Sequence, residues 1–135
     1  MVDDFEPWSH FVRSILQLNA NWQIIDVASD GLEAVQKAEE LQPHLIILDI
    51  NLPNLSGIDA ARQIRTVAPE SKILFLTQES DPDVARTALH SGARGYVLKE
   101  DLVGDLVTAI EAVILGKQFV SRGLTGYDFN DATDL

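Results

Sequence analysis

The sequence predicts an α/β fold with a parallel sheet, and three observations support this. Short apolar runs alternate along the chain with longer amphipathic segments, the pattern of repeated strand–helix units. The run at 45–48 is continuously apolar, which is typical of a strand buried on both faces. Proline and glycine punctuate the boundaries, as at Pro43, Pro53 and Gly57. Strands joined through helices must run parallel, with right-handed crossovers.

Each element follows from its own pattern. A helical spacing of apolar residues begins at Pro7, and Ser29 or Asp30 can cap a second helix with an apolar face of Leu32, Val35, Ala38 and Leu41. Strands are expected where the runs are short and β-branched. The expected helices are 7–18, 31–41, 57–67, 81–91 and 102–114, and the expected strands are 1–2, 22–28, 44–49, 73–76 and 95–98.

Composition narrows the classes of function. A chain of 135 residues with 46% hydrophobic residues suits one globular domain. The net charge of −11 disfavours direct contact with nucleic acid and favours a cation or a basic partner surface. Cysteine is absent, which excludes disulfides and Cys-ligated zinc, and no apolar run is long enough to span a membrane. We therefore expect a cytoplasmic protein.

The ends of the predicted strands carry the candidate chemistry. Because the carboxyl ends of parallel strands share one edge of the sheet, the side chains that follow each strand should gather there. They are three carboxylates, a hydroxyl and an ammonium: Asp3, Asp4, Asp49, Thr77 and Lys99. Carboxylates crowded in one cleft need a cation, and oxygen ligands without His or Cys select a hard ion such as Mg²⁺.

This set of groups suits phosphoryl transfer. A carboxylate such as Asp49 can attack phosphorus and form an aspartyl-phosphate. The transferred group has three equatorial oxygens that need positive or donor partners. A bound cation, Lys99 and the Thr77 hydroxyl with a backbone N–H can each take one of them.

The same residues resemble the receiver domain of bacterial two-component response regulators. The resemblance lies in the acid pair Asp3–Asp4, Asp49 followed by the letters INLPNLSG, Thr77, Tyr96 and Lys99. The segments GLEA at 31–34 and SGARGY at 91–96 are similar to the branch usually fused to a LuxR-type helix-turn-helix. The resemblance implies a receiver domain over 1–118, followed by a linker or flexible tail over 119–135.

The resemblance also implies roles for single residues. Asp49 would be the phosphoacceptor, supplied by a histidine kinase, and Lys99 would bridge to it or to the phosphoryl group. Thr77 and Tyr96 would form the switch pair, with a homodimer as one outcome of switching. Mg²⁺ would be held by the carboxylates of Asp3, Asp4 and Asp49 and the backbone carbonyl of Asn51. Such domains have a flavodoxin-like, doubly wound sheet of strand order 2-1-3-4-5.

Two alternatives remain open from the sequence. A phosphohydrolase of the haloacid dehalogenase type also forms an aspartyl-phosphate, but it normally has a second acid where this chain has Asn51. A degenerate receiver that only mediates protein contacts is the other, because only Met1 and Val2 precede the acid pair and the first strand is severely shortened. We expect that the natural coding start lies upstream, or that another segment or another chain partly fills that gap, for which 118–121 is the best candidate within this chain. The output should be signalling rather than turnover of a substrate.

Overall fold

The computed structural model describes residues 6–17 and 28–124. None of the helices in this described part is long and apolar enough to cross a membrane. The helices are α1 (Glu6–Leu16), α2 (Gly31–Leu41), α3 (Gly57–Val67), α4 (Pro82–His90) and α5 (Leu102–Ile114), with short 3₁₀ helices η1 (Lys99–Asp101) and η2 (Arg122–Leu124). The strands are β1 (Leu45–Leu48), β2 (Lys72–Thr77), β3 (Gly95–Leu98) and β4 (Phe119–Val120).

The sheet of the described residues is entirely parallel and has the order β1-β2-β3-β4. Its register pairs Leu48 with Phe75, and Thr77 with Leu98. The three strands expected around 45–48, 73–76 and 95–98 are therefore confirmed as neighbours in that order. The expected strand at 1–2 and all of 22–28 except Ala28 lie outside the described residues.

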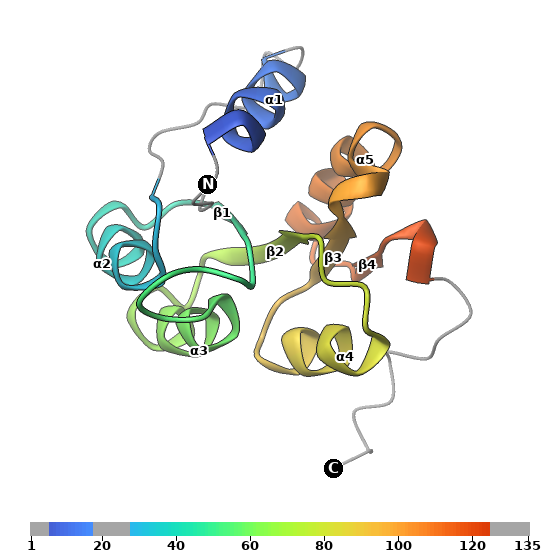
Figure 1. Cartoon of the computed structure of the whole chain (residues 1–135). Coiled ribbons are helices and arrows are strands. Elements are labelled where there is room, and N and C mark those ends of the chain that lie inside the picture. The colour runs from blue at the N-terminus through green and yellow to red at the C-terminus, as the bar shows by residue number, and fades with distance from the viewer. Residues whose placement is uncertain (1–5, 18–27, 125–135) are drawn as a thin grey trace.

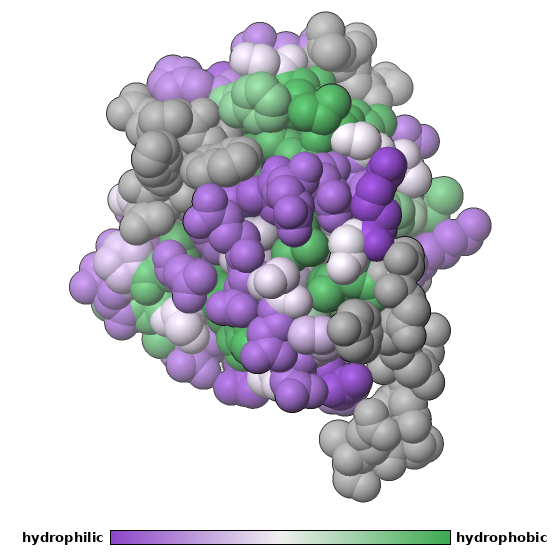
Figure 2. Space-filling model, turned by 45° about the vertical axis from the view of Figure 1, so that its right-hand side comes forward, coloured by the Kyte–Doolittle hydropathy of each residue, from purple (hydrophilic) through white to green (hydrophobic). Residues whose placement is uncertain are grey.

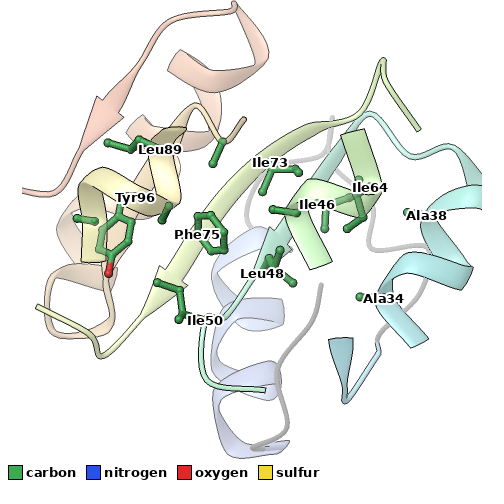
Figure 3. Close-up of a cluster of buried hydrophobic side chains, with 14 of the residues drawn as sticks. Ala34, Ala38, Ile46, Leu48, Ile50, Ile64, Ile73, Phe75, Leu89 and Tyr96 are labelled. Atoms are coloured by element: carbon green, nitrogen blue, oxygen red, sulfur yellow. The ribbon is translucent and has the colours of Figure 1, made fainter. Parts of the chain in front are cut away.

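Helices cover both faces of this sheet (Figure 1). Helices α1 and α5 lie on one face, where Val12 and Leu16 pack in a cluster with strand residues and the apolar side of α5. Helices α2, α3 and α4 lie on the other face, over a cluster that includes Leu48, Phe75 and Tyr96 (Figure 3). The α/β architecture predicted from the alternating runs is thus the one observed.

Helix α2 buries only part of the expected side, since Ala38 is buried and Val35 packs against the core. Leu32 and Leu41 are 56% and 42% exposed, whereas Gly31, Ala34 and Ala38 are buried. The cause is a close approach: a Cβ on Gly31 would lie 2.0 Å from the carbonyl oxygen of Leu55. Small residues let α2 pack tightly against the loop before α3, and the leucines consequently face outwards. The cap was predicted correctly, since the Asp30 carboxylate accepts from the Glu33 N–H at 2.8 Å.

The segment expected to be a linker or tail begins as part of the fold. Residues 119–120 form β4, which pairs with β3, and Leu124 in η2 is 2% exposed. Because β4 lies beside β3, at the sheet edge opposite β1, residues 118–121 do not fill the place of the shortened first strand. The extent of the receiver unit itself stays a prediction.

Candidate functional site

Asp49 lies at the carboxyl end of β1 and is 6% exposed. One carboxylate oxygen, Oδ1, accepts from the Ile50 N–H at 2.6 Å and from the Asn51 N–H at 3.4 Å. The chain then turns back, because the Gly57 N–H donates to the Ile50 carbonyl at 2.7 Å. A Cβ on Gly57 would lie 1.9 Å from the backbone oxygen of Asp49, so only glycine fits this turn.

Lys99 follows β3 and meets Asp49 across the end of β2. Its Nζ donates to the second carboxylate oxygen, Oδ2, at 2.9 Å, and both side chains are buried, at 5% and 8% exposure. The pairing predicted from the strand ends is confirmed as a contact, because β1 and β3 flank β2 in the sheet. Partnership with Lys99 offsets much of the desolvation cost of a buried carboxylate.

Thr77 and Tyr96 are joined through the backbone of one residue, Glu79. The Glu79 N–H donates to Thr77 Oγ1 at 3.3 Å, and the Tyr96 hydroxyl donates to the Glu79 carbonyl at 2.7 Å. Both Thr77 and Tyr96 are fully buried. Sequence reasoning missed Glu79 because its backbone acts here, and a backbone role leaves no signal in residue type.

The Tyr96 ring already occupies the interior in this structure. Its centroid lies 6.2 Å from that of Phe75, and Figure 3 shows the ring among the buried side chains with its hydroxyl at the margin. Burial raises the pKa of the phenol well above its ordinary value, and the charges of Glu79 and Asp49 add to this. An inward movement of the ring on switching is therefore not needed from this state. The hydroxyl is held at the margin of the core by its bond to the Glu79 carbonyl.

The predicted metal ligands are only partly within the described residues. Asp3 and Asp4 lie outside them, and within them no three His, Asp or Glu side chains come together to hold an ion. Asn51 is exposed in the loop directly after Asp49. A single buried carboxylate beside an exposed loop fits Mg²⁺, which takes one or two carboxylates and keeps several waters. The ligand roles of Asp3, Asp4 and the Asn51 carbonyl stay predictions.

Comparison with known families decides the identity. A family model described as the response regulator receiver domain matches residues 1–111. The chain belongs to this family. It is the receiver domain of a two-component response regulator, a signalling protein rather than a classical enzyme.

Similar proteins place this receiver domain in a branch of the family. It is 32% identical to the transcriptional regulatory protein LnrK of Bacillus subtilis, over 97% of this chain and 60% of that protein. It is 38% identical to the oxygen regulatory protein NreC of Staphylococcus epidermidis, over 82% of this chain and 51% of that protein. The chain thus spans about half to three-fifths of the length of these relatives.

A solved structure agrees with this placement. The crystal structure of a LuxR-family two-component response regulator from Aurantimonas sp. superposes with a TM-score of 0.83 at 31% identity. The superposition covers 87% of this chain and 84% of that one. Resemblance to the LuxR-type branch, expected from the segments at 31–34 and 91–96, is confirmed.

Proposed function

We propose that this receiver domain is a switch controlled by phosphorylation of Asp49. The observation that carries the proposal is the buried contact between Asp49 Oδ2 and Lys99 Nζ at the carboxyl edge of the sheet. In this contact the Asp49 carboxylate lies beside the Lys99 ammonium. The same ammonium could bind an oxygen of a phosphoryl group transferred to Asp49. Thr77 is the last residue of the neighbouring strand β2, and its hydroxyl would turn toward a phosphoryl oxygen.

The reaction would be a direct displacement at phosphorus. A carboxylate oxygen of Asp49 forms the new O–P bond while the N–P bond of a phosphohistidine breaks, and the released imidazole nitrogen takes up a proton. Lys99 would stabilise one phosphoryl oxygen, and Thr77 Oγ1 would donate to another. Mg²⁺, held by Asp49 with Asp3, Asp4 and the Asn51 carbonyl, would neutralise charge on the phosphoryl oxygens. Hydrolysis of the acyl phosphate by water would return the domain to its starting state.

Switching would begin at Thr77. When its hydroxyl turns to a phosphoryl oxygen, it no longer accepts the hydrogen bond from the Glu79 N–H. The loop that contains Glu79 would then change its conformation. The Tyr96 hydroxyl is bound to the carbonyl of the same residue, so its position depends on that loop. The Thr77→Ala variant should take up phosphate but no longer change its surface. A phosphorylation-dependent change in self-association that is identical in Thr77→Ala and the parent would refute this route.

The partners follow from the chemistry and the family. A histidine kinase would supply the phosphoryl group, and the −11 net charge of this chain leaves DNA contact to a separate output domain in a longer protein. A second copy of the chain is a further partner that we propose for the surface formed by α4, β3 and α5. Support comes from Val103 in α5 and Leu115 directly after it, which are 77% and 71% exposed. Figure 2 shows a hydrophobic area in the upper part of a surface that is otherwise mostly hydrophilic. We propose a cytoplasmic location and a complete strand order of 2-1-3-4-5.

The two alternatives have less support. The haloacid dehalogenase mechanism needs a second carboxylate where the exposed Asn51 lies. A domain with only contact functions would have no use for a buried pair such as Asp49–Lys99.

One experiment tests the proposal. The parent and Asp49→Asn are incubated with acetyl phosphate and Mg²⁺, and their intact masses are measured. The parent should gain one phosphoryl group that is lost on mild alkaline treatment, as acyl phosphates are, and Asp49→Asn should gain none. Acyl phosphate on the Asp49→Asn variant would show that the acceptor is another residue.

A further inference from the structure

The segment after α5 is fastened to the turn that carries Lys99. The carboxylate of Asp105 accepts from Arg122 through its backbone N–H at 3.1 Å, Nε at 3.1 Å and Nη2 at 2.8 Å. The Ser121 hydroxyl lies between the carboxylates of Asp101 and Asp105 and hydrogen-bonds to both. The Gly123 N–H donates to Asp101 at 3.0 Å. We name this set of bonds, made by Asp101 and Asp105 with residues 121–123, the clasp.

The clasp is built into the interior. Asp105 is 5% exposed and Ser121 is fully buried. A carboxylate so deeply buried needs its donors, because an unpaired charge there would be costly. In the helix α5, Asp105 lies on the core-facing side beside Leu102 and Leu106, which are also buried. An acid at such a position indicates a fixed structural partner, and residues 121–122 supply it.

Three observations show that the clasp lies next to Lys99 and the end of β3. Asp101 belongs to the same single turn, η1, that begins with Lys99. The Ser121 N–H donates to the Tyr96 carbonyl at 2.8 Å. A Cβ on Gly123 would lie 2.8 Å from the Leu98 side chain and 3.0 Å from Asp101 Oδ2, so the segment packs directly on the end of β3. The segment therefore contacts both the end of β3 and the turn that begins with Lys99.

We propose that residues 121–123 are positioning residues for phosphoryl transfer, acting on Lys99 through the clasp. The inference rests on the proposed function of Asp49 and Lys99 and extends it to the chain beyond α5. With the clasp closed, η1 holds Lys99 against Asp49. With the clasp open, the lysine is less well oriented.

Thermodynamic linkage gives the proposal a second consequence. If closing the clasp favours the phosphorylated form, phosphorylation must favour the closed clasp by the same factor. The direction of the chain after residue 123 would then depend on whether Asp49 is phosphorylated. A coupling of about fivefold, at the low end of typical couplings, is expected because only one turn separates the two sites.

The test uses the 135-residue chain and three variants. Asp105→Asn keeps the shape but weakens the clasp. Arg122→Lys keeps the positive charge but loses the two hydrogen bonds that Nε and Nη2 donate to Asp105. This variant replaces Asp105→Asn in the test if Asp105→Asn does not fold. Asp59→Asn is the matched control, because it makes the same charge change in an exposed pair with Arg62 on α3. Circular dichroism checks that each is folded.

Two quantities are measured with beryllofluoride and Mg²⁺ as a phosphoryl mimic. The first is the affinity of each protein for beryllofluoride, which should fall about fivefold in Asp105→Asn and not in Asp59→Asn. The second is the rate of trypsin cleavage after residue 122, which requires the clasp to open. In the parent, beryllofluoride should slow this cleavage by about the same fivefold factor. In Arg122→Lys, where trypsin can still cleave after residue 122, beryllofluoride should slow cleavage much less.

The outcomes separate the two proposals. A parent that binds no beryllofluoride would overturn both the proposed function and this inference. A parent that binds it, with no protection of the bond after residue 122, would overturn the clasp alone. Equal affinity in the parent and in folded Asp105→Asn and Arg122→Lys would overturn it as well. A purely structural clasp would lower stability but leave cleavage independent of beryllofluoride.

Discussion

Two buried carboxylates, the proposed phosphoacceptor Asp49 and the clasp residue Asp105, differ in their hydrogen-bond partners although both lie in the interior of one fold. Their exposures are nearly equal, at 6% and 5%. Asp105 receives four donors, three of them from Arg122. Asp49 receives three, one of them a long contact of 3.4 Å from Asn51. Burial alone therefore does not distinguish the two. The difference lies in how many hydrogen bonds the carboxylate oxygens of each residue accept.

The electrostatics of Asp105 agree with this view. Burial would raise the pKa of Asp105, but the hydrogen bonds from Arg122, its charge and the Ser121 hydroxyl outweigh burial and lower it. In return, Asp105 raises the pKa of the Arg122 guanidinium. Asp105 is thus held ionised by partners that fill its oxygens. Asp49 keeps capacity for a cation or a phosphorus atom at the edge of the sheet.

The largest expected effect comes from removing the cation of each pair. Lys99→Ala should slow acyl phosphate formation from acetyl phosphate by about 10²–10³-fold, the usual loss when a group facing developing charge is deleted. Arg122→Ala removes a cation that pairs with the structural acid Asp105 and not with Asp49, so its rate should stay within about tenfold of the parent. Initial rates are measured by intact mass at saturating Mg²⁺. Similar losses in both variants would remove the distinction between the two carboxylates.

Glycine substitutions test how tightly each region is built. Gly57→Ala should cost about 1–3 kcal/mol of unfolding free energy, because its Cβ would meet the Asp49 carbonyl oxygen at 1.9 Å. It should also impair phosphorylation, since the backbone of Asp49 must shift. Gly116→Ala, just after α5, has open space around it but a φ of +81°, so strain of about 1–2 kcal/mol is its only cost.

Urea denaturation and phosphorylation rates are compared for both variants. Gly116→Ala should lose stability while keeping the parent rate. A Gly57→Ala variant that is phosphorylated as fast as the parent would show that the turn after β1 is looser than its geometry indicates.

Much of the site was predictable because strand ends in a parallel sheet must meet. Continuous apolar runs located β1, β2 and β3, and that alone brought Asp49 and Lys99 together. The exposed side of α2 was not predictable, because it depends on a close approach between Gly31 and Leu55, which are distant in sequence. The Glu79 link was hidden because it uses backbone atoms.

The start of the C-terminal segment, residues 119–124, is ordered for a reason that the sequence composition does not show. A polar, acidic composition after residue 120 is typical of a tail. Residues 119–120 pair with β3, and 121–123 are held by acids of α5 and η1, neither of which composition reveals. Asp105 carried the one available signal, an acid at a core spacing within an apolar helix face.

A smaller effect is expected at the switch contact. Tyr96→Phe removes the hydroxyl that donates to the Glu79 carbonyl, which should cost about 0.5–1.5 kcal/mol of unfolding free energy. The variant should also lose part of the alkaline sensitivity of the parent. Because the folded pKa of Tyr96 is raised, its contribution is complete below an unfolded value of about 10 and is lost as pH rises above it. Urea denaturation of both proteins at neutral and alkaline pH checks this. An unchanged difference across that range would contradict a buried, neutral phenol.

The smallest effect concerns acid and the clasp. The folded pKa of Asp105 is lowered, so its contribution to stability is present above its unfolded pKa, about 3.9, and is lost as pH falls through the folded value. The stability difference between the parent and Asp105→Asn should therefore hold from neutral pH to about pH 5 and shrink below about pH 4. Because the Arg122 side chain is 68% exposed, solvent screens the pair and the pH-dependent part should stay below about 1 kcal/mol. Urea denaturation at several pH values measures it, and added salt should reduce it further. A difference that grows as the pH falls would mean that the clasp is held by a protonated Asp105, and the contrast with Asp49 would have to rest on geometry alone.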